Sequence, residues 1–261
     1  MFKLFYLSIL FSSCIYAQST NSFLYSYYFQ VDSTDVNYSG EDTMLLEVKG
    51  QKTIFHSIKT LEANLYYFGN SQQLLESGLD LVNAPKSALE YTIKGNFKND
   101  SLEIFQDYIT YKFRYFEINP EIVWKIDNEQ KLYMNYTVQK ATTTFKGRKY
   151  IAWFAPEIPI SSGPYKFKGL PGLIVEIYDP KKTHHFWLIE VGSKIHIPEN
   201  YYKGYSLVTK KDFEKFLHLY RTDVYAGLKG GTKFSEEVER NLKNNMEERN
   251  RRRNNPIELT D

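Results

Sequence analysis

The hexapeptide Gly169-Leu170-Pro171-Gly172-Leu173-Ile174 constrains the fold more than any other part of this chain. Pro171 and Gly172 suit the two central positions of a type II turn. Proline has the φ that the first position requires, and glycine accepts the positive φ of the second. The apolar, β-branched run that follows, up to Tyr178, is typical of a buried strand. We therefore predict a tight turn leading into a strand, with the side chains of Leu170 and Leu173 buried beside it.

The same hexapeptide carries little chemistry of its own. None of its side chains can transfer a proton, attack a carbon atom or bind a metal ion. Its backbone amides could cradle an anion, but the Lys and the Ser or Thr of a phosphate-binding loop are missing. Turn chemistry alone accounts for every residue, so a packed structural turn is favoured over a ligand-binding turn.

Aromatic residues are abundant, with 22 Tyr and 18 Phe among 261 residues, and such residues are enriched in β-sheets. Turn residues separate a series of short apolar runs. These runs predict strands over residues 23–31, 44–48, 52–58, 89–97, 102–109 and 111–118. A polar loop is expected over residues 32–42, and a short helix over residues 72–81. The pattern indicates a mainly β (α+β) fold: a strongly twisted antiparallel sheet, curled as in a half-barrel, with C-terminal helices.

Two helices are predicted near the C-terminus, over residues 209–221 and 235–250. Thr209 and Ser235 each precede a helical pattern and can cap its first turn. Apolar side chains recur at helical spacing in both segments: Phe213, Phe216, Leu217 and Tyr220 in the first, and Val238, Leu242 and Met246 in the second. Each helix therefore has one apolar face that can pack against the sheet.

Residues 1–17 have the pattern of a cleaved secretory signal peptide, with the charge of Lys3 followed by a short apolar run. That run is too short for a transmembrane helix, which needs roughly 20 apolar residues. Cleavage after Ala17 would leave residues 18–261 as one domain, because no Pro- or Ser-rich linker divides them. Lipidation of Cys14 is the alternative. A soluble periplasmic or secreted product is favoured, since Phe11 stands where a lipobox usually has Leu.

Residues 163–179 as a whole resemble the GLPGLI family of exported bacterial proteins, which is named after the hexapeptide. They read Gly-Pro-Tyr-Lys-Phe-Lys, then the hexapeptide, then Val-Glu-Ile-Tyr-Asp. Residues 135–141, residues 148–156 and the terminal Asn-Pro-Ile-Glu at 255–258 resemble that family as well. The resemblance implies an exported protein with a β-rich domain. It implies no activity, because the role of the family is largely unassigned.

Charge and motif content argue against several classes of function. The net charge of +2 indicates neither nucleic acid nor an anionic surface as an obligatory partner. The chain lacks the sequence motifs of serine hydrolases and of zinc proteases, so we predict no catalytic residue, no cofactor and no metal site. His184 and His185 are the best candidates for a metal site. Adjacent residues on a strand point to opposite faces, so the two cannot easily share one ion, even with His196 as a further ligand.

Arg249, Arg251, Arg252 and Arg253 form the densest basic cluster of the chain. Cations at a helix C-terminus complement the helix dipole, which is one interpretation of the cluster. The other is a docking patch for lipid headgroup phosphates or for an acidic partner. The sequence leaves both interpretations open.

We predict an exported, non-catalytic envelope protein. As a periplasmic binding or accessory factor for an outer-membrane transport or assembly system, it would need an exposed apolar patch for its protein partner. As a carrier of a hydrophobic ligand or lipidated cargo, it would instead need a cavity within the curled sheet. A hydrolase, the less favoured alternative, would need a cleft with convergent polar groups of perturbed pKa.

Overall fold

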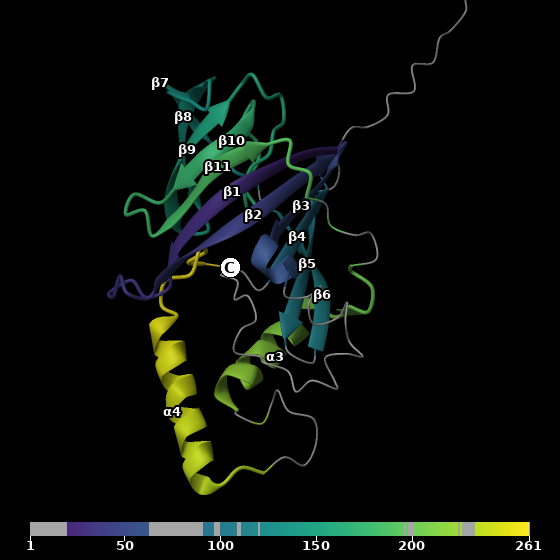
Figure 1. Cartoon of the computed structure of the whole chain (residues 1–261), viewed down its shortest axis with the longest axis vertical. Helices are drawn as coiled ribbons and strands as arrows, with labels where there is room; N and C mark the ends of the chain where they lie inside the picture. The colour runs from purple at the N-terminus through teal and green to yellow at the C-terminus, as the bar shows by residue number, and fades with distance from the viewer. Residues whose placement is uncertain are drawn as a thin grey trace, which may run out of the picture.

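The computed structural model describes residues 20–62, 91–96, 100–108, 111–119, 121–195, 197, 201–223, 225 and 233–260 (Figure 1). The helix expected over residues 72–81 and the candidate ligand His196 lie outside these residues. Within the described residues, twelve strands form one open sheet that is not closed into a barrel, which confirms the mainly β fold with C-terminal helices.

The first half of the sheet is an antiparallel meander, in which each strand pairs with the next one along the chain. Its strands are β1 (Thr20–Gln30), β2 (Ser39–Lys49), β3 (Lys52–Ser57), β4 (Tyr91–Asn96), β5 (Ser101–Tyr108) and β6 (Tyr111–Ile118). Gly50, with a φ of 58°, makes the tight turn between β2 and β3, in the gap between the strands predicted over residues 44–48 and 52–58.

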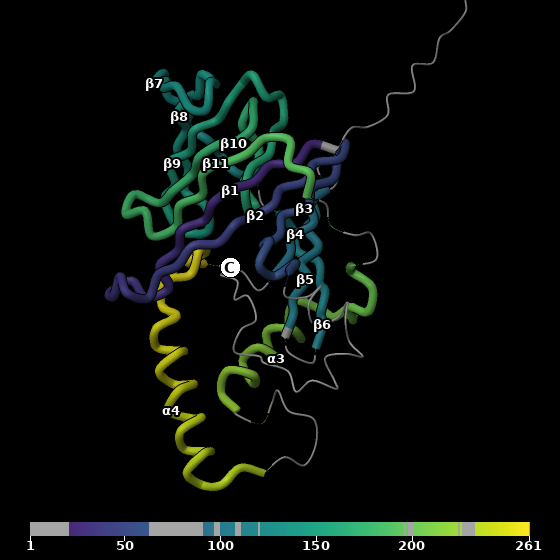
Figure 2. Tube along the Cα trace, in the orientation of Figure 1, coloured from purple at the N-terminus to yellow at the C-terminus, as the bar shows by residue number. Residues whose placement is uncertain are grey.

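The second half is a separate antiparallel meander. Its strands are β7 (Lys125–Tyr133), β8 (Tyr136–Phe145), β9 (Arg148–Ala155), β10 (Leu173–Tyr178) and β11 (His184–Val191). Antiparallel pairing of β1 with β11 joins the two halves, and the short β12 (Ser206–Leu207) pairs in parallel with β6. The path of the chain through both halves can be followed in Figure 2.

The connection from β6 to β7 requires the sheet to curl. These strands lie ten places apart in the sheet order, which corresponds to about 48 Å in a flat sheet. The chain between Ile118 and Lys125 can span at most about 25 Å. The two regions of the sheet must therefore approach each other, and the inner face of the curl carries the aromatic core, including Tyr25, Phe154 and Phe186.

The polar loop expected over residues 32–42 is too long by four residues, because β2 already begins at Ser39. Its polar residues suit a strand once they are paired. The buried Asp42 carboxylate accepts a hydrogen bond from Ser57 Oγ at 2.9 Å. Buried polar groups cost little stability when they are hydrogen-bonded, and that pairing depends on a residue 15 positions away.

The hexapeptide forms a tighter turn than the predicted type II turn. The Gly172 N–H donates to the carbonyl oxygen of Leu170 at 2.9 Å, which closes a three-residue γ-turn around Pro171. The Leu173 N–H donates to Ile158 at 3.0 Å instead of closing a four-residue turn. Leu170 and Leu173 are buried, whereas Pro171 is exposed. A Cβ on Gly172, whose φ is 155°, would lie 2.3 Å from the carbonyl oxygen of Ala155.

Two helices follow the sheet: α3 (Lys210–Thr222), capped by Thr209, and α4 (Glu236–Arg252), capped by Ser235. The Phe213 ring of α3 stacks on Tyr115 with ring centroids 5.0 Å apart, so α3 covers the inner face of β6. In contrast, α4 has no buried residue and projects away from the sheet (Figure 1). In the described part of the chain, no helix combines the length and the apolar character needed to cross a membrane.

Candidate binding site on the concave face

A cavity of about 810 Å³ lies between the inner face of the sheet and the two helices. Pockets for small molecules occupy roughly 300–1,000 Å³, so this volume suits an organic ligand. The sheet contributes aromatic side chains to the wall, among them Tyr27, Phe29 and Tyr91, and Leu217 of α3 lines the opposite side. The wall is therefore apolar where β1, β4 and α3 contribute to it.

His184 supplies a buried polar group to this wall and is held in one tautomer. Its Nε2 lies 3.0 Å from the carbonyl oxygen of Asn255, which can only accept, so Nε2 carries the hydrogen. Its Nδ1 then accepts a hydrogen bond from the Tyr27 hydroxyl at 2.8 Å. Burial, together with the nearby charge of Arg148, lowers the pKa of His184 to about 4. At neutral pH the imidazole is uncharged and fully hydrogen-bonded, which suits a structural wall.

The C-terminal tail closes one side of the cavity and is strapped to the sheet. The Asn255 side chain donates to the carbonyl oxygen of Gln30 at 2.6 Å and accepts from the Arg148 guanidinium at 2.7 Å. The Tyr150 hydroxyl donates to the carbonyl oxygen of Ile257 at 2.7 Å. The terminal Asn-Pro-Ile-Glu of the sequence is therefore a strap that joins both halves of the sheet.

A second cavity of about 410 Å³ shares Tyr91, Gln106 and Leu217 with the first and is more polar. At its edge the buried Lys166 ammonium contacts the carboxylates of Glu117 and Glu258, the latter at 2.8 Å. Each charged group has a partner of opposite sign, which offsets the cost of burying it.

Tyr165, in the segment before the hexapeptide, also lines this second cavity and donates to the Glu258 carboxylate. It has a φ of 59°, the left-handed conformation that bulky residues rarely adopt. Burial, followed by the influence of Tyr91 and Glu258, raises the pKa of its hydroxyl, so it stays a hydrogen-bond donor. The segment before the hexapeptide thus contributes side chains to the cavity, whereas the hexapeptide contributes none among the lining residues.

The four arginines of the predicted basic cluster lie in different surroundings. Arg252 is partly buried: its guanidinium lies 3.5 Å from the carboxylate of Asp35 and stacks on the Tyr38 ring at 3.6 Å. Arg249 lines the larger cavity from the last turn of α4, and its C-cap Arg253 lines it as well. Arg251 is exposed and does not line the cavity.

The two adjacent histidines point to opposite faces of the sheet, as the strand period predicts. His184 faces the cavity, whereas His185 Nε2 lies 3.0 Å from the Glu176 carboxylate on the outer face. The other carboxylate oxygen of Glu176 accepts from the Lys131 ammonium at 2.5 Å. Lys131, Glu176 and His185 therefore form a clasp that ties β7 to β10 and β11.

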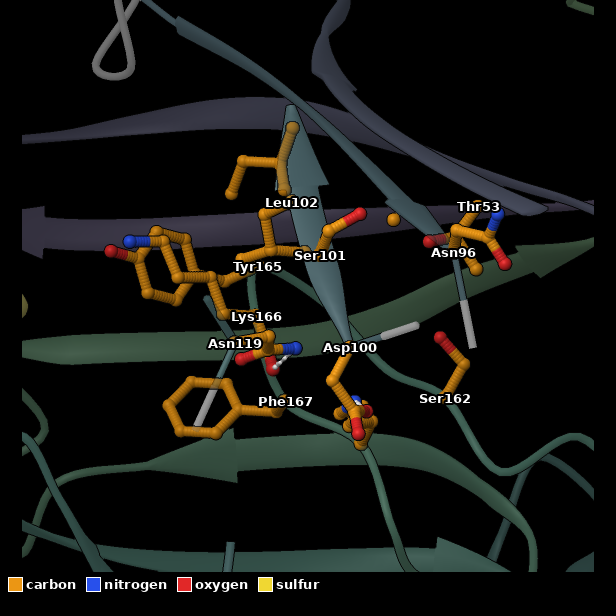
Figure 3. Close-up of a pocket in the computed structure, with 13 residues that line it drawn as sticks. Thr53, Asn96, Asp100, Ser101, Leu102, Asn119, Ser162, Tyr165, Lys166 and Phe167 are labelled. Carbon is orange, nitrogen blue, oxygen red and sulfur yellow. Dashed lines mark hydrogen bonds and ion pairs between the residues drawn. The ribbon is translucent and has the colours of Figure 1, made fainter. Parts of the chain in front are cut away.

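A third pocket, of about 20 Å³, lies where the segment before the hexapeptide meets β4 and β5 (Figure 3). Asn119, Ser162 and Lys166 are among its lining residues, and the Asn119 amide contacts the carbonyl oxygen of Lys166 at 3.4 Å. Such a volume holds about one water molecule. This pocket is too small for an organic ligand, so the candidate site is the pair of larger cavities.

Sequence reasoning did not find most of the residues that line these cavities. Tyr27, Tyr91 and Gln106 lie on strands far apart in the chain, and nothing in their local patterns distinguishes them from other half-buried strand residues. One sequence signal that falls on the cavity wall is the Asn-Pro-Ile-Glu at 255–258, through its resemblance to the GLPGLI family.

Comparison with known proteins adds information on family and fold. Residues 144–176, which include the hexapeptide, match the Porph_ging family, described as a protein of unknown function. A comparison with the curated proteins found no match. Two structures of PNGF-II, in the space groups P21 and C2, share the fold, with TM-scores of 0.53 and 0.52 and sequence identities of 13% and 14%.

The alignment with PNGF-II covers 75% of this chain but only 32% of PNGF-II. At this level of identity the likeness extends to the fold alone. By sequence, the stretch over residues 144–176 is thus similar to the Porph_ging family of unknown function, and by fold the chain is similar to part of PNGF-II.

Proposed function

We propose that this chain is an exported, non-catalytic carrier that holds a hydrophobic ligand or lipidated cargo on the concave face of its sheet. The cavity of about 810 Å³ is the observation that supports this role most directly. Phe29, Val31 and Ile257 give it an apolar wall. The polar groups of Tyr27 and His184 bond to each other within that wall, so they do not compete for a ligand.

Export and family membership belong to the same proposal. Residues 1–17 have the features of a signal peptide, and the hexapeptide lies within the stretch that matches the Porph_ging family. We propose on this basis that the chain is a GLPGLI-type protein of the periplasm or the secreted fraction. A carrier in that compartment needs no cofactor, and it meets hydrophobic cargo that must cross an aqueous space.

Filling the cavity tests the carrier role. Leu217 lines both cavities from α3, so Leu217→Trp reduces their volume. We expect it to weaken binding of a neutral fluorescent naphthylamine probe roughly tenfold. Leu219→Trp is the matched control, because Leu219 lies on the same helix, is 52% exposed and does not line either cavity. Equal binding by wild type and both variants, or no binding by wild type, would argue against the carrier.

A specific observation also favours the accessory-factor alternative. Ile118 and Val123, at the connection from β6 to β7, are 82% and 80% exposed, the highest values among the large apolar side chains that the structure describes. If they contact an envelope protein, the double variant Ile118→Ser and Val123→Ser should lose a stoichiometric partner in affinity purification from the native envelope. Retention of every co-purifying protein by the variant would count against this alternative.

A further inference from the structure

Two arginines present their charge to the larger cavity at the C-terminal end of α4. Arg249 lies in the last turn of the helix, and Arg253, four positions later, is its C-cap. Both line the cavity, together with Arg252 and with Arg221 of α3. Glu248 is the carboxylate among the described lining residues, so positive charge predominates at this end.

The position of these arginines follows from the anchoring of Arg252. Its guanidinium lies 2.9 Å from the carboxylate of Glu248 on the same helix and 3.7 Å from that of Asp32 in the turn after β1. Hydrogen bonds from Thr34 and Asn254 lower the pKa of Asp32 to about 2, so the anchoring carboxylate stays ionised. With Arg252 held in place, the helical period turns Arg249 and Arg253 toward the cavity and Arg251 away from it.

The helix dipole explains why cations occur in the last turn, but it does not explain why two of them face a cavity. Two cations that line the same cavity repel each other. Arg249 forms no ion pair with any residue in the described ranges, and its side chain is exposed. An oxyanion between the two guanidiniums would relieve this repulsion, because the planar guanidinium matches carboxylate and phosphate oxygens.

We propose that the ligand of this cavity is an anionic single-chain amphiphile, with its oxyanion head against Arg249 and Arg253 and its aliphatic chain along Phe29 and Ile257. This inference rests on the proposed carrier function and narrows it to one class of ligand. The apolar wall accounts for the chain, and the cavity volume is sufficient for it. The arginine pair accounts for the negatively charged head group, which a neutral sterol or triglyceride lacks.

The test compares the fluorescent anthroyloxy derivative of stearic acid with its methyl ester, which differs only in the loss of the charge. The wild-type protein should bind the acid roughly tenfold more tightly than the ester, the effect of a charge-assisted hydrogen bond in a partly exposed site. The double variant Arg249→Gln and Arg253→Gln should lose this preference and bind the acid as weakly as the ester. Added salt should weaken binding of the acid only.

Arg251→Gln is the matched control, because it removes the same charge from the same helix turn outside the cavity. It should keep the preference for the acid. Equal binding of acid and ester by wild type would overturn the head-group assignment but not the carrier function. An equal loss of the preference for the acid in the double variant and in Arg251→Gln would have the same meaning. Failure of wild type to bind the acid, the ester and the neutral naphthylamine probe would overturn the carrier as well.

Discussion

His184 Nε2 donates a hydrogen bond to the backbone carbonyl oxygen of Asn255 across 3.0 Å. This contact joins β11 to the C-terminal strap, and both residues line the larger cavity. The Tyr27 hydroxyl donates to Nδ1, which can accept a hydrogen bond only while the imidazole is neutral. The hydrogen bonds that fix His184 in the cavity wall are therefore linked to its protonation state.

The stability of the fold should decrease as the pH falls from 6.5 to 4. In this range the unfolded His184 binds a proton, whereas the folded side chain, with a pKa of about 4 instead of 6.5, does not. The free energy of unfolding should fall by about 3 kcal/mol from this residue across that range. Urea denaturation at several pH values measures the slope. His184→Gln should reduce the slope, and His218→Gln, at an exposed position of α3, should leave it unchanged.

Part of that slope should survive in His184→Gln, because burial also lowers the pKa of His56, to about 3. The removal of both histidines should therefore flatten the profile further. A slope that is the same in wild type and in the double variant would contradict this account.

The strap should depend on the Asn255 side chain. Asn255→Ala removes a partner from the mostly buried Arg148 guanidinium and leaves the Gln30 carbonyl without its donor. We expect a loss of about 2–4 kcal/mol in the free energy of unfolding, since buried polar groups lose their partners. Asn244→Ala, at an exposed position in α4, serves as the control and should change stability by less than about 0.5 kcal/mol. Similar values for both variants would refute the strap.

The hexapeptide should be sensitive at its second glycine and tolerant at its proline. Gly172→Ala places a Cβ 2.3 Å from the carbonyl oxygen of Ala155 and should cost about 3 kcal/mol or more. Pro171 is exposed, so Pro171→Ala should cost about 1 kcal/mol or less. Gly192→Ala separates strain from steric clash, because its φ is 77° but no atom lies within 4 Å of its Cβ. It should fall between the other two in calorimetry.

The alternative interpretation of the hexapeptide as a ligand-binding turn has its own signature. The combined variant Pro171→Ala and Gly172→Val would then fold with unchanged stability while the cellular phenotype is lost. A loss of stability in parallel with the phenotype supports the packed turn.

Lys166 and Lys168 should differ in their contribution to stability although they lie two positions apart. Lys166→Met leaves the carboxylates of Glu117 and Glu258 without their shared cation and should cost about 3–5 kcal/mol. Lys168 pairs with Asp100, whose side chain is 65% exposed, so Lys168→Met should cost less than about 1 kcal/mol. Chemical denaturation of both variants decides the matter, and equal losses would show that Lys166 is not a buried bridge.

Features that depend on a few neighbouring residues could be predicted from the sequence. The turn at Gly50 and the helix caps at Thr209 and Ser235 follow from backbone preferences and local hydrogen bonds, and the structure has each of them. The opposite orientation of His184 and His185 follows from the two-residue period of a strand.

Other features went beyond local patterns. The γ-turn at Pro171 depends on Ile158. The carbonyl oxygen of Ile158 accepts the hydrogen bond from the Leu173 N–H, so this N–H does not close a four-residue turn. The division of the arginine cluster depends on Asp32 and Asp35, more than two hundred positions before Arg252. Ile158 cannot be identified as a partner from the residues around the hexapeptide, and Asp32 and Asp35 cannot be identified from the residues around Arg252.

The sequence by itself thus determined strands β1 to β6 and β10, the turn at Gly50 and the helix caps at Thr209 and Ser235, because each follows from the conformational preferences of adjacent residues. Only the tertiary structure decided that β1 pairs with β11 and that the strap and two helices line a cavity on the concave face of the sheet. These features arise when distant segments bury their apolar faces together, and many arrangements satisfy the same local preferences. The candidate binding site belongs to this second group, since its walls come from both halves of the sheet.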